Sequence, residues 1–378
     1  MRAPVLLLGA LRVTACAAFL SAAASPPTAF RSAGVTVPAP PAVRSSSAAA
    51  ASGGGGSDDV DVDPSEYDLT LFSPCKINLF LRILRKRPDG FHDLASLFQT
   101  VAFGDDLYLK LLDGGDGDEF LCNMPGVPVD RTNLVLRALD LVRERTGTTD
   151  RYFRANLVKQ VPAQAGLGGG SGNAAAAMYG ANELLGRPAT PEQLVEWSGE
   201  LGSDITFFLS HGTAYCTGRG EVMTPVRAPF GPVKLTIVKP DMGLSTPQVF
   251  GALDYEALSE EDPEELLAHF LESGVGPGGD DAYVNDLEQP AFDCLPELRE
   301  LKEELLGVEG FDHVMMSGSG TSIFCIGEAT DQDAFLAEFG GREGISVFPT
   351  EFISRGEGEG VWFDRDQGWT DAKSYASI

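Results

Sequence analysis

Basic residues are scarce in this 378-residue chain, which has 28 Lys and Arg against 55 Asp and Glu and a formal net charge of −27. Proteins that bind nucleic acid present a basic surface to the phosphates, so no nucleic acid is expected as a partner. Most carboxylates, as in 259-SEEDPEELL-267, are expected to be solvated surface. The hydrophobic content of 43% suits one large or two ordinary globular domains.

Cysteine and histidine are few as well. The six cysteines include no CxxC pair, and the four histidines include no HExxH motif. These absences disfavour a disulfide framework, a zinc knuckle and a zinc hydrolase. We therefore expect no protein metal ligands and a chemistry that depends on carboxylate, lysine and backbone groups.

Acidic residues are absent from positions 1–57, which are largely Ala, Ser, Pro and Gly. The start, 2-RAPVLLLGALRVTACAAFLSAAAS-25, is typical of a signal peptide, and Arg12 interrupts the apolar run that a membrane-spanning helix needs. The Ser-rich, Arg-bearing continuation is typical of a transit peptide, and the whole resembles the bipartite leaders of complex plastids. We expect a presequence and linker at 1–57, import into the plastid stroma, and no membrane in the mature form. The alternative is a disordered N-terminus that carries no targeting signal.

Strand and helix patterns alternate irregularly, without a repeat. Apolar β-rich runs predict strands at 67–72, 77–84, 107–112, 153–158, 233–238 and 322–326. Capping and periodicity predict helices over 133–147, 173–186, 190–201 and 262–273. Thr190, Pro191 and Gln193 form a capping-box signature, and Asp262 with Pro263 repeats the cap. The pattern predicts an α+β fold.

Five glycines fall within 166-GLGGGSG-172, between a predicted strand and a predicted helix. Backbone N–H groups and the positive end of the helix dipole converge there, where no Cβ obstructs an anion. A tight turn alone would need one or two glycines, so a phosphate site is favoured. The pattern GxxxxGK[ST] does not fit this stretch. The pattern GxGxxG occurs only at 274-GVGPGG-279, without a preceding strand, and is interpreted as a chance match.

Three blocks resemble the motifs of the GHMP kinases: 73-SPCKINLFL-81, 162-PAQAGLGGGSGNAA-175 and 316-MSGSGTSIF-324. Other blocks, at 76–101, 202–209, 245–250 and 285–292, are similar to the 4-diphosphocytidyl-2-C-methyl-D-erythritol kinase family of the non-mevalonate isoprenoid pathway. The resemblance implies a two-domain fold with the active site between the domains. It implies a βαβ-type ATP-binding domain at 58–230, a ferredoxin-like α/β domain at 231–365 and a tail at 366–378.

The resemblance also implies roles for individual residues. Asp204 matches the catalytic base for the 2-hydroxyl group of the substrate, and Lys76 matches the neighbouring lysine that stabilises the transferring phosphoryl group. ATP is the implied co-substrate, with Mg²⁺ between phosphate oxygens. The residues expected to bind ATP are Gly166, Gly168, Gly169, Gly170, Ser171, Gly172 and Asn173. The family usually has Ser-Ser-Asn where this chain has 171-SGN-173.

The second implied substrate is a cytidyl diphospho-alcohol. Phe91 and Phe250 would sandwich the cytosine, and the backbone and ring of His92 would read its polar edge. Asn78 faces the same side of its strand as Lys76 and would bond the erythritol hydroxyls. The remaining expected substrate residues are Thr246, Gly318, Ser319 and Gly320. The two small-molecule substrates are the expected partners. The expected oligomeric state is a monomer or a homodimer.

Two other functions stay open from the residues. One is a GHMP kinase for a smaller alcohol such as homoserine or mevalonate. The other is a catalytically silent nucleotide-binding protein of the same fold. The pair of Lys76 and Asp204, together with the block 87-RPDGFH-92, speaks against the first of these functions, and the retention of both Lys76 and Asp204 speaks against the second.

Overall fold

The structure is a computed structural model that describes residues 62–227, 230–277, 282–356 and 360–365. All of these residues belong to one compact unit, Ser57–Ile378. The expected presequence at 1–57 and tail at 366–378 lie outside the described residues, as does the end of the 274–279 match.

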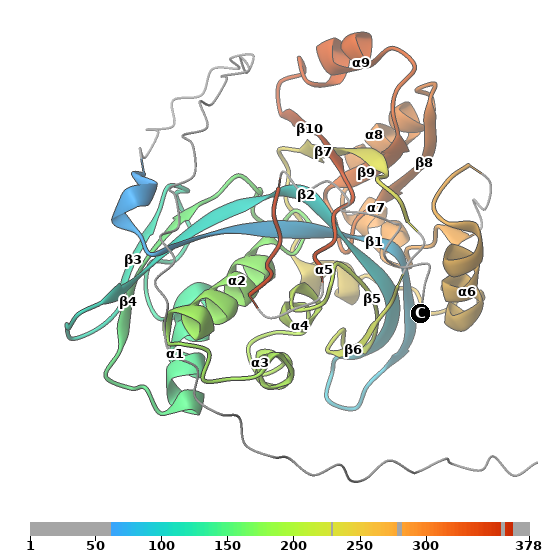
Figure 1. Ribbon diagram of the computed structural model, residues 1–378. Helices are drawn as coiled ribbons and strands as arrows, with labels where there is room; N and C mark the ends of the chain where they lie inside the picture. The colour runs from blue at the N-terminus through green and yellow to red at the C-terminus, as the bar shows by residue number, and fades with distance from the viewer. Residues whose placement is uncertain (1–61, 228–229, 278–281, 357–359, 366–378) are drawn as a thin grey trace, which may run out of the picture. The chain divides into compact units, whose positions relative to one another are not determined.

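Two sheets organise the described chain (Figure 1). One has the strand order β3-β4-β2-β5-β6, with β1 paired to β2, and the other has the order β10-β7-β9-β8. The strands are β1 (Leu69–Lys86), β2 (His92–Leu112), β3 (Glu119–Cys122), β4 (Tyr152–Val158), β5 (Thr213–Gly218), β6 (Val222–Pro225), β7 (Lys234–Pro240), β8 (Phe311–Met316), β9 (Ile323–Gly327) and β10 (Ile345–Glu351). The helices are η1 (Pro64–Glu66), α1 (Leu134–Thr146), α2 (Gly169–Leu184), α3 (Pro191–Ser198), α4 (Ile205–Phe208), α5 (Thr246–Gly251), α6 (Pro263–Ser273), α7 (Glu288–Cys294), α8 (Pro296–Leu306) and α9 (Gln332–Phe339).

Strand β1 joins two runs that the sequence predicted as separate strands. Residues 73–76 between these runs are buried and pair with β2. The register shifts between Pro74 and Cys75, which accommodates a proline that cannot donate to the ladder. The prediction of two strands was therefore wrong, because pairing with β2 along its whole length overrides the local signal of the proline.

Helix α2 begins at Gly169, about one turn before the predicted start at Asn173. Glycine disfavours helix interiors, so the glycine run was interpreted as a loop. In the structure this turn lies against β1, and residues 174–177 are fully buried alanines. Close packing, which only small side chains permit, extends the helix into the glycines.

The four-stranded sheet has the ferredoxin-like topology that the resemblance implied. Its strands follow the order β-α-β-β-α-β along the chain, and all of its pairs are antiparallel. In the other sheet β3 and β4 are parallel and α1 connects them, which is the expected βαβ unit. The α+β prediction and the two-domain fold are confirmed.

The predicted helix caps are present. Thr190 and Gln193 exchange both bonds of the capping box, and Asp262 accepts from the N–H groups of Glu264 and Glu265.

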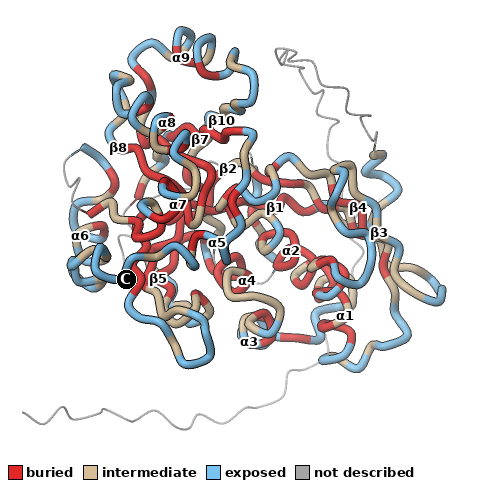
Figure 2. Tube along the Cα trace, turned by 180° about the vertical axis from the view of Figure 1, so that it is seen from behind, coloured by how far each residue is buried: buried red, intermediate tan, exposed pale blue. Residues whose placement is uncertain are grey.

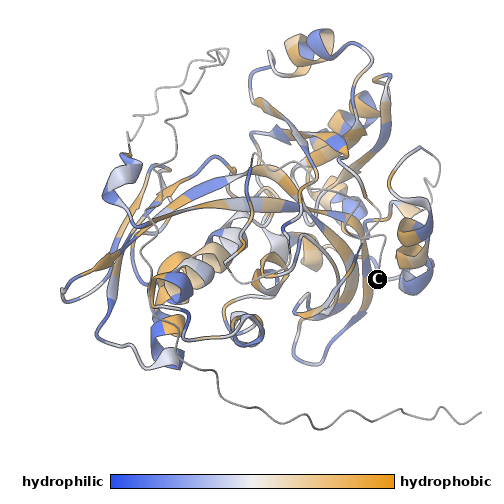
Figure 3. Cartoon of the chain, in the orientation of Figure 1, coloured by the Kyte–Doolittle hydropathy of each residue, from blue (hydrophilic) through white to orange (hydrophobic). Residues whose placement is uncertain are grey.

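None of the described helices combines the length and the apolar character that crossing a membrane requires. Buried residues follow α2, β1 and β2 (Figure 2). Helix α6 displays hydrophobic and hydrophilic residues, as an amphipathic surface helix does (Figure 3).

Candidate active site

A cleft of about 1140 Å³ gathers nearly every residue that the sequence singled out. It lies among β1, the start of β2, the N-terminus of α2, α5 and the loop after β8. The predicted residues that line it are Lys76, Asn78, Phe91, His92, Gly166, Gly168, Gly169, Gly170, Ser171, Asn173, Asp204, Thr246, Phe250, Gly318, Ser319 and Gly320. Gly172 does not line it.

Lys76 and Asp204 form the charged pair of this cleft. Lys76 Nζ lies 3.7 Å from Asp204 Oδ2, and the lysine side chain is 5% exposed whereas the aspartate side chain is 35% exposed. Lys76 Nζ also donates to Asn78 Oδ1 at 2.7 Å, and Asn78 Nδ2 donates to Ser96 Oγ at 2.8 Å. Burial lowers the pKa of Lys76, and the nearby charge of Asp204 acts in the opposite direction. Asn78 thus holds the ammonium beside a carboxylate that remains open to the cleft.

The N-terminus of α2 faces the same cleft. Its N-cap is Gly168, in the left-handed region with φ 67°, and it offers no side chain to cap the helix. The N–H groups of the first turn have no partner within the helix, so those of Gly169, Gly170 and Ser171 are suited to an anion. The N–H of Gly172 instead donates to the carbonyl of Gly168 at 2.9 Å.

The assignment of Gly172 to the nucleotide is therefore corrected. A Cβ at this position would lie 2.6 Å from the carbonyl oxygen of Pro74, because the glycine packs directly against β1. The serine that the resemblance implied for this position would not fit this backbone unchanged. Gly172 is required for close packing, and its N–H is already used by the helix.

Asn173 lines the cleft, but its side chain is engaged in a buried polar cluster. Its Nδ2 donates to Ser73 Oγ and to Asp105 Oδ2, both at 2.9 Å, and its Oδ1 accepts from Lys159 Nζ at 3.1 Å. These bonds anchor the N-terminus of α2 to β1 and β2. The amide of Asn173 thus orients the helix.

Sequence reasoning missed Asp105 and Lys159, which complete this cluster. Asp105 is fully buried, pairs with Lys159, and accepts from the N–H groups of Gln160 and Val161 at 2.7 and 2.8 Å. Lys159 also lines the cleft. The only available signal was a lysine shortly before the glycine run. Residues 104-GDD-106 look like an exposed acidic turn.

The two glycine blocks pack against each other beside the charged pair. Gly166 has φ 73°, and a Cβ there would meet the carbonyl oxygen of Ser317 at 2.1 Å. A Cβ on Gly318 would lie 3.4 Å from Asn78 Oδ1 and 3.5 Å from Lys76 Nζ. The conformation and close approach of both residues require glycine. The loop after β8 thereby supports the glycine loop, as the resemblance implied.

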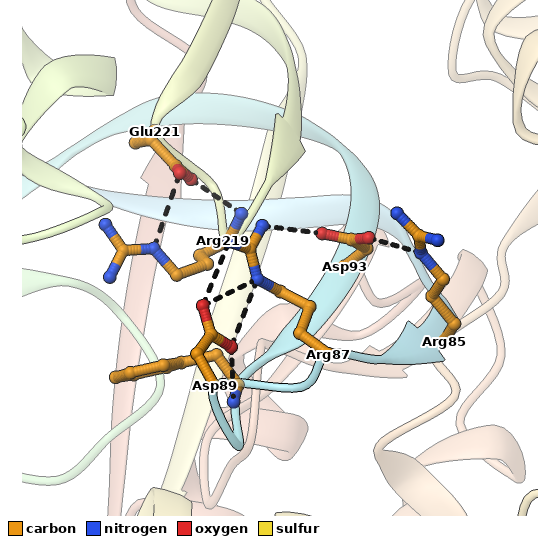
Figure 4. A network of polar contacts seen from close by, with 7 residues as sticks. Arg85, Arg87, Asp89, Asp93, Arg219 and Glu221 are labelled. Carbon is orange, nitrogen blue, oxygen red and sulfur yellow. Dashed lines mark hydrogen bonds and ion pairs between the residues drawn. The ribbon is translucent and has the colours of Figure 1, made fainter.

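An ion-pair network fixes the turn between β1 and β2 at the rim of the cleft. Arg87 pairs with Asp89 and Asp93, and Arg85 also pairs with Asp93. Asp89 Oδ1 accepts from the N–H of Phe91 at 3.1 Å. The bonds from these arginines lower the pKa of both aspartates. Figure 4 shows the network together with Arg219 and Glu221. The turn that presents Phe91 is thus held by several polar contacts.

Aromatic side chains of the rim come from separate segments. Phe91 is 55% exposed, and the guanidinium carbon of Arg219 lies 5.1 Å from its ring centroid. Phe250, on α5, packs against His92 with ring centroids 4.8 Å apart. Arg219 also lines the cleft, and the sequence analysis missed it. It lies in the turn between β5 and β6, where no motif pointed to it.

Thr246 and Ser319 meet across the cleft wall. Their hydroxyl oxygens are 2.9 Å apart, which connects α5 with the loop after β8. Among the described residues, no group of three or more His, Cys, Asp or Glu side chains could hold a metal ion. The polar groups of the cleft include the charged pair, the cationic side chains of Lys159 and Arg219, the imidazole of His92, backbone N–H groups, hydroxyls and amides.

Comparisons with known proteins agree with this geometry. Residues 133–212 match the family model of the GHMP kinases N terminal domain, and residues 255–344 match that of the GHMP kinases C terminal domain. The chloroplastic 4-diphosphocytidyl-2-C-methyl-D-erythritol kinase of Oryza sativa subsp. japonica is 46% identical over 309 residues, which cover 81% of this chain and 75% of that protein. The 4-diphosphocytidyl-2-C-methyl-D-erythritol kinase of Protochlamydia amoebophila is 45% identical over 278 residues, which cover 74% of this chain and 91% of that protein.

A solved structure extends the agreement to three dimensions. The crystal structure of a 4-(cytidine 5'-diphospho)-2C-methyl-D-erythritol kinase superposes with a TM-score of 0.63 at 32% identity, covering 76% of this chain and 100% of that one. The chain thus resembles that enzyme in sequence and shares its fold. The chain belongs to the 4-diphosphocytidyl-2-C-methyl-D-erythritol kinase family of the GHMP kinases.

Proposed function

We propose that this chain transfers the γ-phosphoryl group of ATP to the 2-hydroxyl group of 4-diphosphocytidyl-2-C-methyl-D-erythritol, in isoprenoid biosynthesis. The observation that carries the proposal is the charged pair. Lys76 and Asp204 lie 3.7 Å apart in one cleft with the uncapped N-terminus of α2. A base, a cation and an anion site in one cleft are what phosphoryl transfer to an alcohol requires. Because the chain belongs to the 4-diphosphocytidyl-2-C-methyl-D-erythritol kinase family, the alcohol is identified as 4-diphosphocytidyl-2-C-methyl-D-erythritol.

Asp204 acts as the base. Its partly exposed carboxylate accepts the proton of the attacking hydroxyl group as that oxygen bonds to the γ-phosphorus, and ADP leaves with the electron pair of the broken bond. Lys76 keeps its ammonium beside both the carboxylate and the transferring group, where a buried cation stabilises developing negative charge strongly. Asn78 fixes the position of that ammonium.

The triphosphate binds at the N-terminus of α2. The N–H groups of Gly169, Gly170 and Ser171 meet phosphate oxygens, and the helix dipole favours the negative charge. Mg²⁺ enters as part of the substrate, bound to the phosphates. This ion commonly binds through substrate phosphates, waters and one or two carboxylates, so the residues present are compatible with it. When bound, it would neutralise phosphate charge during transfer.

The cytidyl group binds at the aromatic rim. Phe91 and Phe250 stack on the pyrimidine, and His92 reads its polar edge. Thr246 and Ser319 offer hydroxyl groups to the substrate where α5 meets the loop after β8. Packing and ion pairs hold these side chains before the substrate arrives, which reduces the entropy lost on binding.

We place the enzyme in a plastid stroma, acting as a monomer or homodimer. The Oryza relative is named chloroplastic, and the acid-free composition of residues 1–57 suits an imported presequence. A domain boundary near residue 230 suits the passage from β6, which ends at Pro225, to β7, which begins at Lys234.

A coupled assay of ADP release tests the proposal. The protein is mixed with ATP, Mg²⁺ and either the cytidyl diphospho-alcohol, homoserine or mevalonate. Turnover is expected with the cytidyl substrate and not with the two smaller alcohols. Preference for homoserine or mevalonate would establish the rival kinase function instead. Binding of an ATP analogue without turnover of any alcohol would indicate a silent nucleotide-binding protein.

A further inference from the structure

The segment that follows β10 returns from the four-stranded sheet to the other sheet (Figure 1). Phe352 forms an antiparallel bridge with Val101 of β2. In its described residues, 352–356 and 360–365, the segment contributes no side chain to the lining of the cleft. It nevertheless contacts the elements that carry the charged pair and the N-terminus of α2.

Arg355 is the residue of this segment that reaches the end of α4. Its Nε donates to the carbonyl of Ser210 at 2.7 Å, and its Nη2 donates to the carbonyl of Leu209. Its backbone N–H donates to the carbonyl of His211 at 3.0 Å. These carbonyls follow the last turn of α4, where no further turn supplies N–H donors. One guanidinium group therefore satisfies two of them at once.

The guanidinium of Arg355 is itself held in place. Burial lowers its pKa to about 10, so the surroundings must stabilise the charge. Its Nη1 donates to the carbonyl of Val361 at 2.9 Å, and its carbon atom lies 5.2 Å from the ring centroid of Trp362. Carbonyl oxygens and an aromatic face thus stabilise the cation and fix its position.

Trp362 extends this contact from α4 to β1 and α2. Its Nε1 donates at 2.7 Å to the carbonyl of Phe72, which lies on β1 four residues before Lys76. Its ring stacks on Tyr179 of α2 with centroids 4.5 Å apart. These contacts join the three elements that carry the charged pair and the phosphate-binding N–H groups.

Asp204 depends on the backbone of α4 for its position. It is the N-cap residue of this helix, but its side chain makes no capping hydrogen bond. Its ion pair with Lys76, at 3.7 Å, is longer than a hydrogen bond. The position of the carboxylate is therefore set by a single turn of helix and by the group that holds the other end of that turn.

We propose that Arg355 is a positioning residue, which holds α4 so that the carboxylate of Asp204 meets the attacking hydroxyl group. The inference rests on the proposed function, in which Asp204 is the base. A general base works only within hydrogen-bond reach of the proton that it takes. A misplacement of about 1 Å caused by a distant change can cost on the order of a hundredfold in rate. Loss of the guanidinium should therefore lower kcat and leave substrate binding nearly intact.

The variants Arg355→Met and Arg355→Lys of the full chain test this role. Methionine keeps the packing against Trp362 but removes both donors to the end of α4, whereas lysine keeps the charge and a donor. We expect kcat to fall about 10- to 100-fold in Arg355→Met and less than about tenfold in Arg355→Lys, with both Michaelis constants within about threefold of the wild-type values. Arg365→Met is the matched control, because that arginine bonds Asp106 of β2 and lies over the ring of Phe72. Its kcat should match that of the wild-type protein.

Two further measurements separate positioning from a loss of folded protein. Calorimetric titration with a non-hydrolysable ATP analogue counts the folded molecules, and its stoichiometry should equal that of the wild-type protein in both Arg355 variants. In an Asp204→Asn background, Arg355→Met should lower the residual kcat no further, because the carboxylate that Arg355 positions is already gone. A radiolabelled-ATP assay measures this residual transfer.

Wild-type kcat in Arg355→Met would overturn the inference, and so would a loss of kcat matched by an equal loss of analogue-binding sites. Equal fractional losses from Arg355→Met with and without the Asp204 carboxylate would also overturn it. If Arg355→Met does not fold, the same comparisons with Arg355→Lys decide. Full activity of Asp204→Asn alone would instead overturn the proposed base, and this inference with it.

Discussion

Gly170 and Gly172 lie in the first turn of α2, yet a methyl group added at each would meet different surroundings. At Gly170 the new Cβ would lie 3.9 Å from Leu134 Cδ1, an ordinary contact, at a position that lines the cleft. At Gly172 it would lie 2.6 Å from the carbonyl oxygen of Pro74. We therefore expect Gly170→Ala and Gly172→Ala to separate nucleotide binding from stability.

The expected magnitudes follow from these distances. Gly170→Ala should leave the free energy of unfolding unchanged or raise it by up to about 1 kcal/mol, the difference in helix propensity. The added methyl group projects at the cleft and should obstruct the approach of a phosphate oxygen to one N–H group; loss of one such bond to a charged phosphate costs about 1.5–3 kcal/mol, so ATP affinity should fall roughly 10- to 150-fold. Gly172→Ala should lose about 1–3 kcal/mol of stability through overpacking against β1. Its ATP affinity should fall less than that of Gly170→Ala.

Two measurements check this pair. Thermal unfolding compares the stabilities, and calorimetric titration with a non-hydrolysable ATP analogue compares the affinities. Titration with the cytidyl substrate serves as the control, because the aromatic rim is built by other segments. Normal binding of the analogue by Gly170→Ala would refute the phosphate site at α2. A Gly172→Ala variant as stable as the wild-type protein would refute the packing argument.

Three further predictions concern the charged pair and the rim. Asp204→Asn should lower kcat by a factor of about 10²–10⁴, because an amide cannot take the proton of the hydroxyl group. Its ATP affinity should stay within a few-fold of the wild-type value. Activity near that of the wild type would contradict the assignment of Asp204 as the base. Burial lowers the pKa of Lys76 in the free protein, so kcat/KM should fall with rising pH before the ordinary lysine value of 10.5 is reached. In the same window the free energy of unfolding should rise, because the unfolded chain binds a proton that the folded chain has released, and Lys76→Met should lack this rise. Phe91→Ala and Phe250→Ala should each weaken the cytidyl substrate by about 1–3 kcal/mol and ATP much less; equal losses for both substrates would indicate a packing role.

Local sequence determined the features that depend on near neighbours. The caps of α3 and α6 formed as predicted, because each needs only residues up to three positions apart. The family motifs also predicted which residues line the cleft, because chains that carry these motifs in the same order share the same backbone arrangement. Lys76 and Asn78 meet because alternate residues of a strand share a face.

Tertiary structure decided the features that depend on distant partners. Asp105 looks like part of an acidic turn, but it is buried under Lys159, which lies 54 residues further along the chain. Tyr255 meets His92 across 163 residues, and no local pattern predicts that contact. Gly172 looks like part of a phosphate loop, yet its place is set by the carbonyl of Pro74 on β1. Composition and periodicity report the secondary-structure preferences of a segment. Burial, strand pairing and close approach arise only when two distant segments of the chain come into contact in the fold.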